Sequence, residues 1–300
     1  MTPLGGSARE ACQQPPPERV PALGSVVAGP YGVAAGGNII GSALGVGSAV
    51  VHVHLPPATA AASWPLLVGI PPLLASSFQP RAVLRAAIDE ARCAGEDVVL
   101  TQVLSGGGGV GKSQLAASYA RDAARAGTDL VLWVSASEVQ QVIALYAHTA
   151  QLIQVPGALG ADVEADARAF LGWLATTSRR WLVVLDDVTD PAELAPWWPA
   201  VHSGVGWVLA TTRRKDGRLT GQGRRKVDVD VYSPAEAVAY IEDRLATDIL
   251  THLLDGSQER IAEELGFLPL AIGHAVAYLI SQQMTCADYL ALLQNPEHSL

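Results

Sequence analysis

The sequence predicts an α/β protein in which a parallel five-stranded sheet is flanked by helices and followed by a small all-α subdomain. Three observations support this fold class. Short apolar segments alternate with helical segments between residues 81 and 231, the pattern that builds a parallel sheet with helices on both faces. A glycine-rich loop connects the first apolar segment to a helix. Beyond residue 232, three or four helical segments follow one another without a strand.

The predicted strands are short and rich in valine and leucine. Val98–Leu104 is largely apolar, as expected for a strand that is buried on both faces. Lys226–Val231 instead alternates apolar and acidic residues, which is typical of a strand at a sheet edge. The five predicted strands are Val98–Leu104, Asp129–Ser135, Trp181–Asp187, Trp207–Thr212 and Lys226–Val231.

The helices are predicted from apolar residues at helical spacing and from signals at the helix ends. Ser233 and Glu236 form a capping-box pattern, and Pro234 suits the first helical position. Gly266 is placed to end one helix and Pro269 to begin the next. The predicted helices are Arg81–Cys93, one beginning near Gly111, Ser137–Ile153, Ala161–Thr176, and then about Pro234–Leu245, Ser257–Leu265, Leu270–Ser281 and Cys286–Leu293.

The composition indicates where the protein is located and which classes of partner it is expected to lack. The formal net charge of −9 argues against general affinity for nucleic acid. Residues Val20–Pro80 contain no Asp, Glu, Lys or Arg, and Val33–Val53 within them is apolar enough to suggest a membrane span. Glycine, serine and Asn38 interrupt this section and no cluster of lysine or arginine flanks it, so we expect no membrane span. Cys12, Cys93 and Cys286 are too far apart to indicate a disulfide framework or a zinc site. A cytoplasmic protein is expected.

The glycine-rich loop carries the strongest chemical signal. Residues 106–113 match G-x-x-x-x-G-K-[ST] and lie between a predicted strand and a predicted helix, the context that this P-loop motif requires. Glycines allow several backbone N–H groups to face one anion, and the amino end of the helix adds a partial positive charge. The alternative, a flexible glycine linker, does not account for the flanking elements. The residues expected to hold phosphate are Gly106, Gly107, Gly108, Gly109, Val110, Gly111, Lys112, Ser113 and Gln114.

Two further strands end in charged residues. In a parallel sheet, ligands bind beyond the carboxyl ends of the strands, so Asp186 and Asp187 are expected near the glycine loop. There Asp186, with Ser113, is placed to hold Mg²⁺, and Asp187 to orient or deprotonate a water molecule. Arg213 follows the next strand and is expected to reach a terminal phosphate. An Asp-rich turn with no catalytic role is the alternative for the two carboxylates.

These signals predict three regions. Residues 1–65 form a low-complexity leader rich in glycine and proline, which we expect to be partly disordered because it can bury little apolar surface. Residues 66–232 form the P-loop nucleotide-binding domain, and residues 233–300 form the helical subdomain.

Four segments together resemble a known family. GGGGVGKS, WLVVLDD, WVLATTR and GFLPLA, in this order, are similar to the motifs of the NB-ARC family, which belongs to the STAND class of P-loop ATPases. The resemblance implies a regulatory switch that holds ADP in a closed form and exchanges it for ATP, with slow hydrolysis and assembly. It also implies that Gly111, Lys112 and Ser113 bind phosphates and Mg²⁺, that Arg213 senses phosphate and that Pro269 packs near the adenine.

The sequence also departs from the family pattern. An apolar-Gly-Arg motif usually precedes the first strand and contacts adenine, but Phe78-Gln79-Pro80-Arg81 stands near that place and lacks the glycine. The winged-helix and repeat regions of the family are not present in these 300 residues, so the resemblance implies a form truncated after the first helical subdomain. The glycine-rich leader resembles regions that precede such modules in multidomain bacterial regulators.

The sequence is compatible with three functions. The first is a nucleotide switch with slow ATP hydrolysis, self-assembly through the ATPase module and a protein effector of unknown identity. The second is an ordinary P-loop ATPase or a phosphotransferase that acts on a small acceptor. The third is a scaffold that retains nucleotide without hydrolysing it.

Overall fold

The computed structural model describes residues 63–102, 108–200, 205–221 and 223–295. These residues all belong to one compact unit that begins at Thr59. The predicted leader, residues 1–65, lies outside the described residues except for its last three. Among the residues that are described, no helix is long and apolar enough to cross a membrane.

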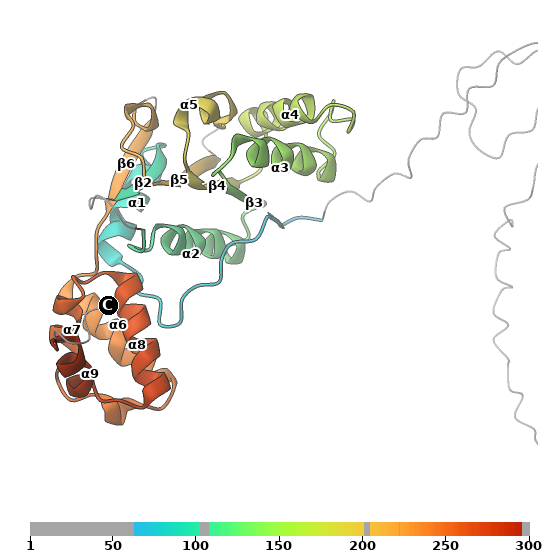
Figure 1. Cartoon of the computed structure of the whole chain (residues 1–300). Helices are drawn as coiled ribbons and strands as arrows, with labels where there is room; N and C mark the ends of the chain where they lie inside the picture. The colour runs from blue at the N-terminus through green and yellow to red at the C-terminus, as the bar shows by residue number, and fades with distance from the viewer. Residues whose placement is uncertain (1–62, 103–107, 201–204, 222, 296–300) are drawn as a thin grey trace, which may run out of the picture. The chain divides into compact units, whose positions relative to one another are not determined.

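The sheet confirms the predicted fold class and adds one strand. All neighbouring strands are parallel, in the order β1-β3-β4-β5-β2-β6 (Figure 1). The five predicted strands are present, but the sheet has six strands because Leu66–Val68 pairs with β3 and forms a new edge strand. The strands are β1 (Leu66–Val68), β2 (Asp97–Gln102), β3 (Leu130–Ser135), β4 (Trp181–Val188), β5 (Gly206–Thr212) and β6 (Arg224–Val229).

The strand order positions the glycine loop. Strand β2, which leads into the loop, pairs with β5 on one side and with β6 on the other. Strand β4 lies on the far side of β5. Because all these strands run in the same direction, their carboxyl ends meet at one edge of the sheet. The segments after β2, β4 and β5 therefore converge.

Helices cover both faces of the sheet. Figure 1 shows α3, α4 and α5 on one face and α2 on the other. Tyr146 and Phe170, from α3 and α4, are fully buried in the core on the first face, while Leu115 of α2 and Ile88 of α1 belong to the second core. The helices of this part are α1 (Ala82–Cys93), α2 (Lys112–Arg125), α3 (Val139–Leu152), α4 (Val163–Thr176) and the short α5 (Pro191–Leu194).

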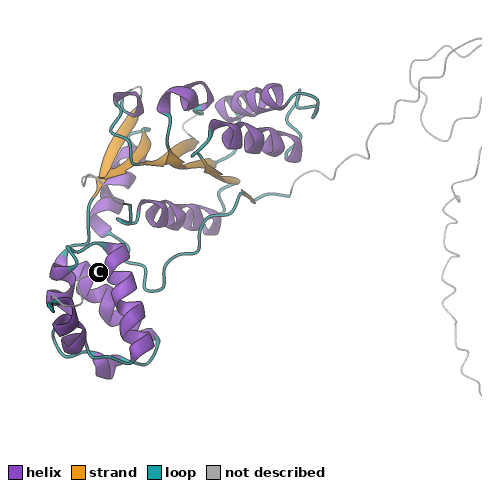
Figure 2. Cartoon of the chain, in the orientation of Figure 1, coloured by secondary structure: helices purple, strands orange, loops and turns teal. Residues whose placement is uncertain are grey.

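The last part of the described chain is all helical, as predicted (Figure 2). It has a separate core made of residues 232–290, with Ile241, Ile261 and Val276 fully buried. The predicted capping box is present, since Ser233 accepts a hydrogen bond from the Glu236 backbone and Glu236 accepts one from the Ser233 N–H. The helices are α6 (Pro234–Thr247), α7 (Gln258–Glu264), α8 (Pro269–Gln282) and α9 (Cys286–Leu293). We call this part, residues 232–293, the helical unit.

Candidate functional site

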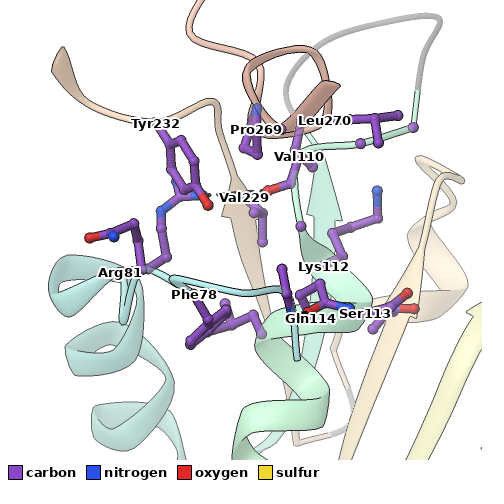
Figure 3. Close-up of a pocket in the computed structure, with 18 of the residues that line it drawn as sticks. Phe78, Arg81, Val110, Lys112, Ser113, Gln114, Val229, Tyr232, Pro269 and Leu270 are labelled. Atoms are coloured by element: carbon purple, nitrogen blue, oxygen red, sulfur yellow. Dashed lines mark hydrogen bonds between the residues drawn. The ribbon is translucent and has the colours of Figure 1, made fainter. Parts of the chain in front are cut away.

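A cavity of about 480 Å³ opens at the edge where the carboxyl ends of the strands meet. Figure 3 shows that its walls come from the start of α2, the segment before α1, the end of β6 and the start of α8. The sheet and the helical unit therefore share the cavity. Its lining residues include Phe78, Gln79, Arg81, Gly108–Leu115, Asp186, Asp187, Thr211, Arg213, Val229, Tyr232, Tyr240, Pro269, Leu270, Gly273 and His274.

The glycine loop forms one end of the cavity. Gly109 and Gly111 have φ angles of +98° and +94°, a conformation that residues with a side chain rarely adopt. Helix α2 begins at Lys112 directly after Gly111, so its first N–H groups face the same space. Gly106 and Gly107, which the sequence also assigns to the loop, lie outside the described residues. The described part of the loop has the geometry of an anion site.

Asp186 lies next to the start of α2. Its Oδ1 accepts hydrogen bonds from the hydroxyls of Ser113 at 2.7 Å and Thr211 at 2.6 Å. A carboxylate beside a serine hydroxyl, both lining a cavity with a glycine loop, is a set of oxygen ligands of the kind that Mg²⁺ prefers. These residues therefore fit a magnesium ion held with phosphate, which would neutralise part of the phosphate charge.

An irregularity in β4 orients the second carboxylate. The pairing of β4 with β5 shifts between Leu185 and Val188, and Asp187 has a φ angle of +60°. Such a bulge changes the direction of a side chain. The Asp187 N–H donates to Thr211 Oγ1 at 2.8 Å, and Asp187 Oδ1 lies 3.7 Å from Nε of Arg213. The side chains of the two successive aspartates thus have different partners, although both residues bond to the Thr211 hydroxyl.

Positive charge gathers opposite these carboxylates. Lys112 is only 8% exposed, and burial together with the nearby Arg213 guanidinium lowers the pKa of its ammonium, while Asp187 and Asp186 act to raise it. Arg213 also lies against the glycine loop, because a Cβ built on Gly108 would be 3.4 Å from its Cζ. Since burial and a like charge both disfavour the Lys112 ammonium, an anion at this end of the cavity would stabilise it.

The other end of the cavity is mostly apolar and aromatic. Phe78, Val229, Tyr232 and Pro269 line it (Figure 3), and Tyr240 is a further aromatic residue of the cavity lining. Flat apolar surfaces of this kind suit an aromatic ring. The cavity therefore has a charged end and an aromatic end, as a nucleotide has a phosphate end and a base.

Arg81 closes this aromatic end. Its guanidinium donates to the backbone carbonyls of Val110 at 3.4 Å, Asp230 at 3.0 Å and Val231 at 2.9 Å. It also lies 3.4 Å from a carboxylate oxygen of Glu236 and 5.1 Å from the ring centre of Tyr232. Arg81 thus ties the segment before α1 to the glycine loop and to the start of the helical unit.

A direct backbone contact joins the helical unit to the glycine loop. The N–H of Leu270, in the first turn of α8, donates to the carbonyl of Gly109 at 3.2 Å. The approach is close, since a Cβ built on Gly109 would lie 2.7 Å from Cβ of Leu270. Any shift of the loop at Gly109 must therefore be accommodated by α8.

The structure brings the described site residues that the sequence predicts to this one cavity. The residues are Gly108, Gly109, Val110, Gly111, Lys112, Ser113, Gln114, Asp186, Asp187, Arg213 and Pro269. Gln114 has an additional structural contact, because its amide bonds to Leu73 O at 3.1 Å and to Ala75 N at 2.7 Å. It fixes the segment that leads to α1.

Sequence reasoning missed several lining residues. Thr211 precedes Arg213 at the end of an apolar strand, and its hydroxyl has no signal beyond that position. Tyr232, Tyr240 and Leu270 reach the cavity only through the packing of the helical unit. No local pattern in the chain marks such residues, because their positions depend on contacts between distant segments.

Comparisons with known proteins find related sequences. The chain is 31% identical over 237 residues to the regulatory protein AfsR of Streptomyces coelicolor, which covers 73% of this chain and 23% of that protein. It is 26% identical over 211 residues to a nucleotide-binding leucine-rich repeat (NLR)-like protein of Hyaloscypha variabilis, which covers 64% of this chain and 21% of that protein. The chain thus spans about a fifth of the length of these relatives.

A solved structure is also similar. It is a signal transduction ATPase with numerous domains (STAND) protein, with a tetratricopeptide repeat sensor, from Pyrococcus horikoshii. The similarity has a TM-score of 0.48 at 15% sequence identity and covers 75% of this chain and 34% of that one.

A family model covers the centre of the chain. The NB-ARC domain model matches residues 91–248, which is more than half of the sequence. The match contains the glycine loop, Asp186, Asp187 and Arg213, while Pro269 and Leu270 lie beyond it. The chain therefore belongs to the NB-ARC family and carries its nucleotide-binding domain.

Proposed function

We propose that this chain is a regulatory switch that binds ADP and ATP with Mg²⁺, hydrolyses ATP slowly and changes the packing of its helical unit with the nucleotide. The observation that carries the proposal is the hydrogen bond from Leu270 N to Gly109 O. It couples the phosphate loop to α8, so a nucleotide bound in the loop affects the position of the helical unit. A nucleotide shifts such an equilibrium only by binding one form more tightly than the other.

The charged end of the cavity supplies the binding groups of this switch. The loop N–H groups, Lys112 and Arg213 hold the phosphates, and Ser113 and Asp186 hold Mg²⁺. Asp187 orients the attacking water and accepts its proton, while its ion pair with Arg213 keeps the two groups together until phosphate competes for the guanidinium. Pro269 and the aromatic residues cover the base.

The regulatory part of the proposal draws on the relatives. AfsR is named a regulatory protein, and the Pyrococcus structure is described as a signal transduction ATPase. We extend both features to this chain, with assembly through the nucleotide-binding module and an effector protein as the outputs of the switch.

Two measurements test the proposal. Mass spectrometry of the protein as purified should detect ADP, because a switch in the closed form retains its nucleotide. Purified wild type should then hydrolyse ATP slowly, and Asp187→Asn should reduce the rate by about 100-fold, the usual contribution of a general base. ADP affinity should stay close to that of wild type, since the substituted side chain keeps its size.

The matched control is Asp190→Asn, an exposed aspartate that caps α5 three residues further on. Asparagine caps a helix as well as aspartate does, so this variant should hydrolyse ATP at the wild-type rate. Fast turnover that requires a small acceptor would favour a phosphotransferase, and nucleotide binding without any hydrolysis would favour a scaffold. Absence of both bound nucleotide and measurable ADP affinity would refute all three functions.

A further inference from the structure

The segment that departs from the family motif, Phe78-Gln79-Pro80-Arg81, contributes Phe78, Gln79 and Arg81 to the cavity lining, and Arg81 lies beside Tyr232 at the aromatic end (Figure 3). Gln79 lines the cavity, although the residue is only 7% exposed. A buried amide at a ligand cavity must satisfy both its donor and its acceptor. How Gln79 does so indicates what it recognises.

The donor half of the Gln79 amide is engaged within the protein. Nε2 donates to the carbonyl of Ser77 at 3.0 Å and to Oδ2 of Asp243, on α6, at 3.2 Å. Both partners accept hydrogen bonds and cannot donate them. Turning the amide over would place Oε1 against two acceptors, so the orientation of the amide is fixed by chemistry.

The acceptor half is unused. Oε1 of Gln79 has no hydrogen-bond partner among the described residues. The group that Gln79 has left to offer a ligand is therefore an acceptor, in a part of the cavity suited to an aromatic base. A base that presents a hydrogen-bond donor would supply the missing hydrogen bond to Oε1.

The neighbouring polar groups do not make this distinction. The hydroxyls of Tyr232 and Tyr240 can donate or accept, so they tolerate either kind of partner. Arg81 offers donors only. Its two Nη atoms donate to the carbonyls of Val110, Asp230 and Val231, and its Nε, which makes no hydrogen bond, lies 3.4 Å from the carboxylate of Glu236. Gln79 is thus the side chain at this end whose fixed polarity can discriminate between bases.

We propose that Gln79 determines base specificity: its Oε1 accepts a hydrogen bond from the 6-amino group of adenine and disfavours a purine with a 6-oxo group, such as hypoxanthine or guanine. Asp243 is a positioning residue that holds the amide in the reading orientation. This inference rests on the proposed nucleotide binding and specifies the base. It also explains how adenine is read in a chain that lacks the usual glycine before Arg81.

The test compares ADP with inosine diphosphate, which differs from ADP in carrying a 6-oxo group. Calorimetric titration of wild type should give an affinity for ADP that is about tenfold or more higher than that for inosine diphosphate. In Gln79→Leu the ratio of the two affinities should fall close to one. The ratio is the readout because a general loss of binding or stability weakens both ligands alike.

Two further variants complete the design. Asp243→Ala frees the amide to turn and present Nε2 to a 6-oxo group, so the ratio should fall while ADP still binds. Gln141→Leu, on the exposed surface of α3 and away from the cavity, should keep the wild-type ratio. If Gln79→Leu fails to fold, wild type itself gives the answer, because purine riboside diphosphate, which lacks the 6-amino group, should bind about as weakly as inosine diphosphate.

The possible outcomes distinguish a failure of this inference from a failure of the proposed function. Wild type that binds ADP and inosine diphosphate equally, or Gln79→Leu that keeps the wild-type ratio, would overturn the role of Gln79 and leave nucleotide binding intact. Wild type that binds no nucleotide would refute the proposed function, and the inference would fall with it.

Discussion

Replacing Lys112 with alanine should weaken ADP binding by about 100-fold, a loss of roughly 3 kcal/mol, which is the upper range for a hydrogen bond to a charged group. Lys112 is buried at the charged end of the cavity, which Arg213, Asp186 and Asp187 also line. Without the Lys112 ammonium the phosphates lose a positive charge, and water can compensate for this loss only in part because the site is buried. Calorimetric titration with ADP measures the loss.

The stability of Lys112→Ala separates a binding defect from a folding defect. In the nucleotide-free protein the pKa of Lys112 is lowered, so folding disfavours its charge at every pH below the unfolded value of 10.5. Removing that charge at neutral pH should leave the melting temperature without nucleotide close to that of wild type. The matched control is Lys226→Ala, an exposed lysine on β6 paired with Asp228. This variant should bind ADP normally, and equal losses in both variants would contradict the role of Lys112.

Replacing Gly109 with alanine should impair both the glycine loop and its contact with α8. The added Cβ would lie 2.7 Å from Cβ of Leu270, so either the loop or α8 must move. We expect a destabilisation of about 1–3 kcal/mol from this overlap, in addition to about 1–2 kcal/mol from the φ angle of +98°. ADP affinity should fall as well, because the N–H groups of the loop are displaced. Chemical denaturation and ADP titration measure the two effects.

Gly157→Ala is the control for backbone strain. Gly157 has a φ angle of +92°, but a Cβ built on it meets nothing within 4 Å. Its substitution should therefore cost only the strain, about 1–2 kcal/mol, and leave ADP affinity unchanged. If the two variants lose equal stability and both bind ADP as wild type does, Gly109 is not held against Leu270 in solution.

The part of the fold that was predictable depends on local signals. The five longer strands and the main helices each carry their own apolar pattern, and the capping box at Ser233 is contained in four residues. Strand β1 has three residues, too few for a pattern to stand out, and it forms because Leu66–Val68 pairs with Leu130–Leu132. Such an edge strand is defined by its partner more than by its own sequence.

The two ends of the cavity also differ in how far the sequence predicts them. Its charged end was predictable, because the glycine loop and the carboxyl ends of parallel strands have sequence signatures, and Asp186 does lie 2.7 Å from the Ser113 hydroxyl. The aromatic end was not, since Tyr232 and Leu270 reach the cavity through the packing of the helical unit. The polarity that Gln79 presents depends on Asp243, 164 residues further along the chain. The chemical roles of all these residues stay predictions until the variants are measured.

The central claim is that the nucleotide in the loop is sensed by the helical unit through Gly109 and Leu270. Hydrogen–deuterium exchange of wild type with and without ADP tests it most directly, because it reports peptides 108–115 and 268–275 in one experiment. We predict that ADP protects both peptides in wild type and neither in Lys112→Ala. Protection of peptide 108–115 with unchanged exchange in peptide 268–275 would contradict the claim.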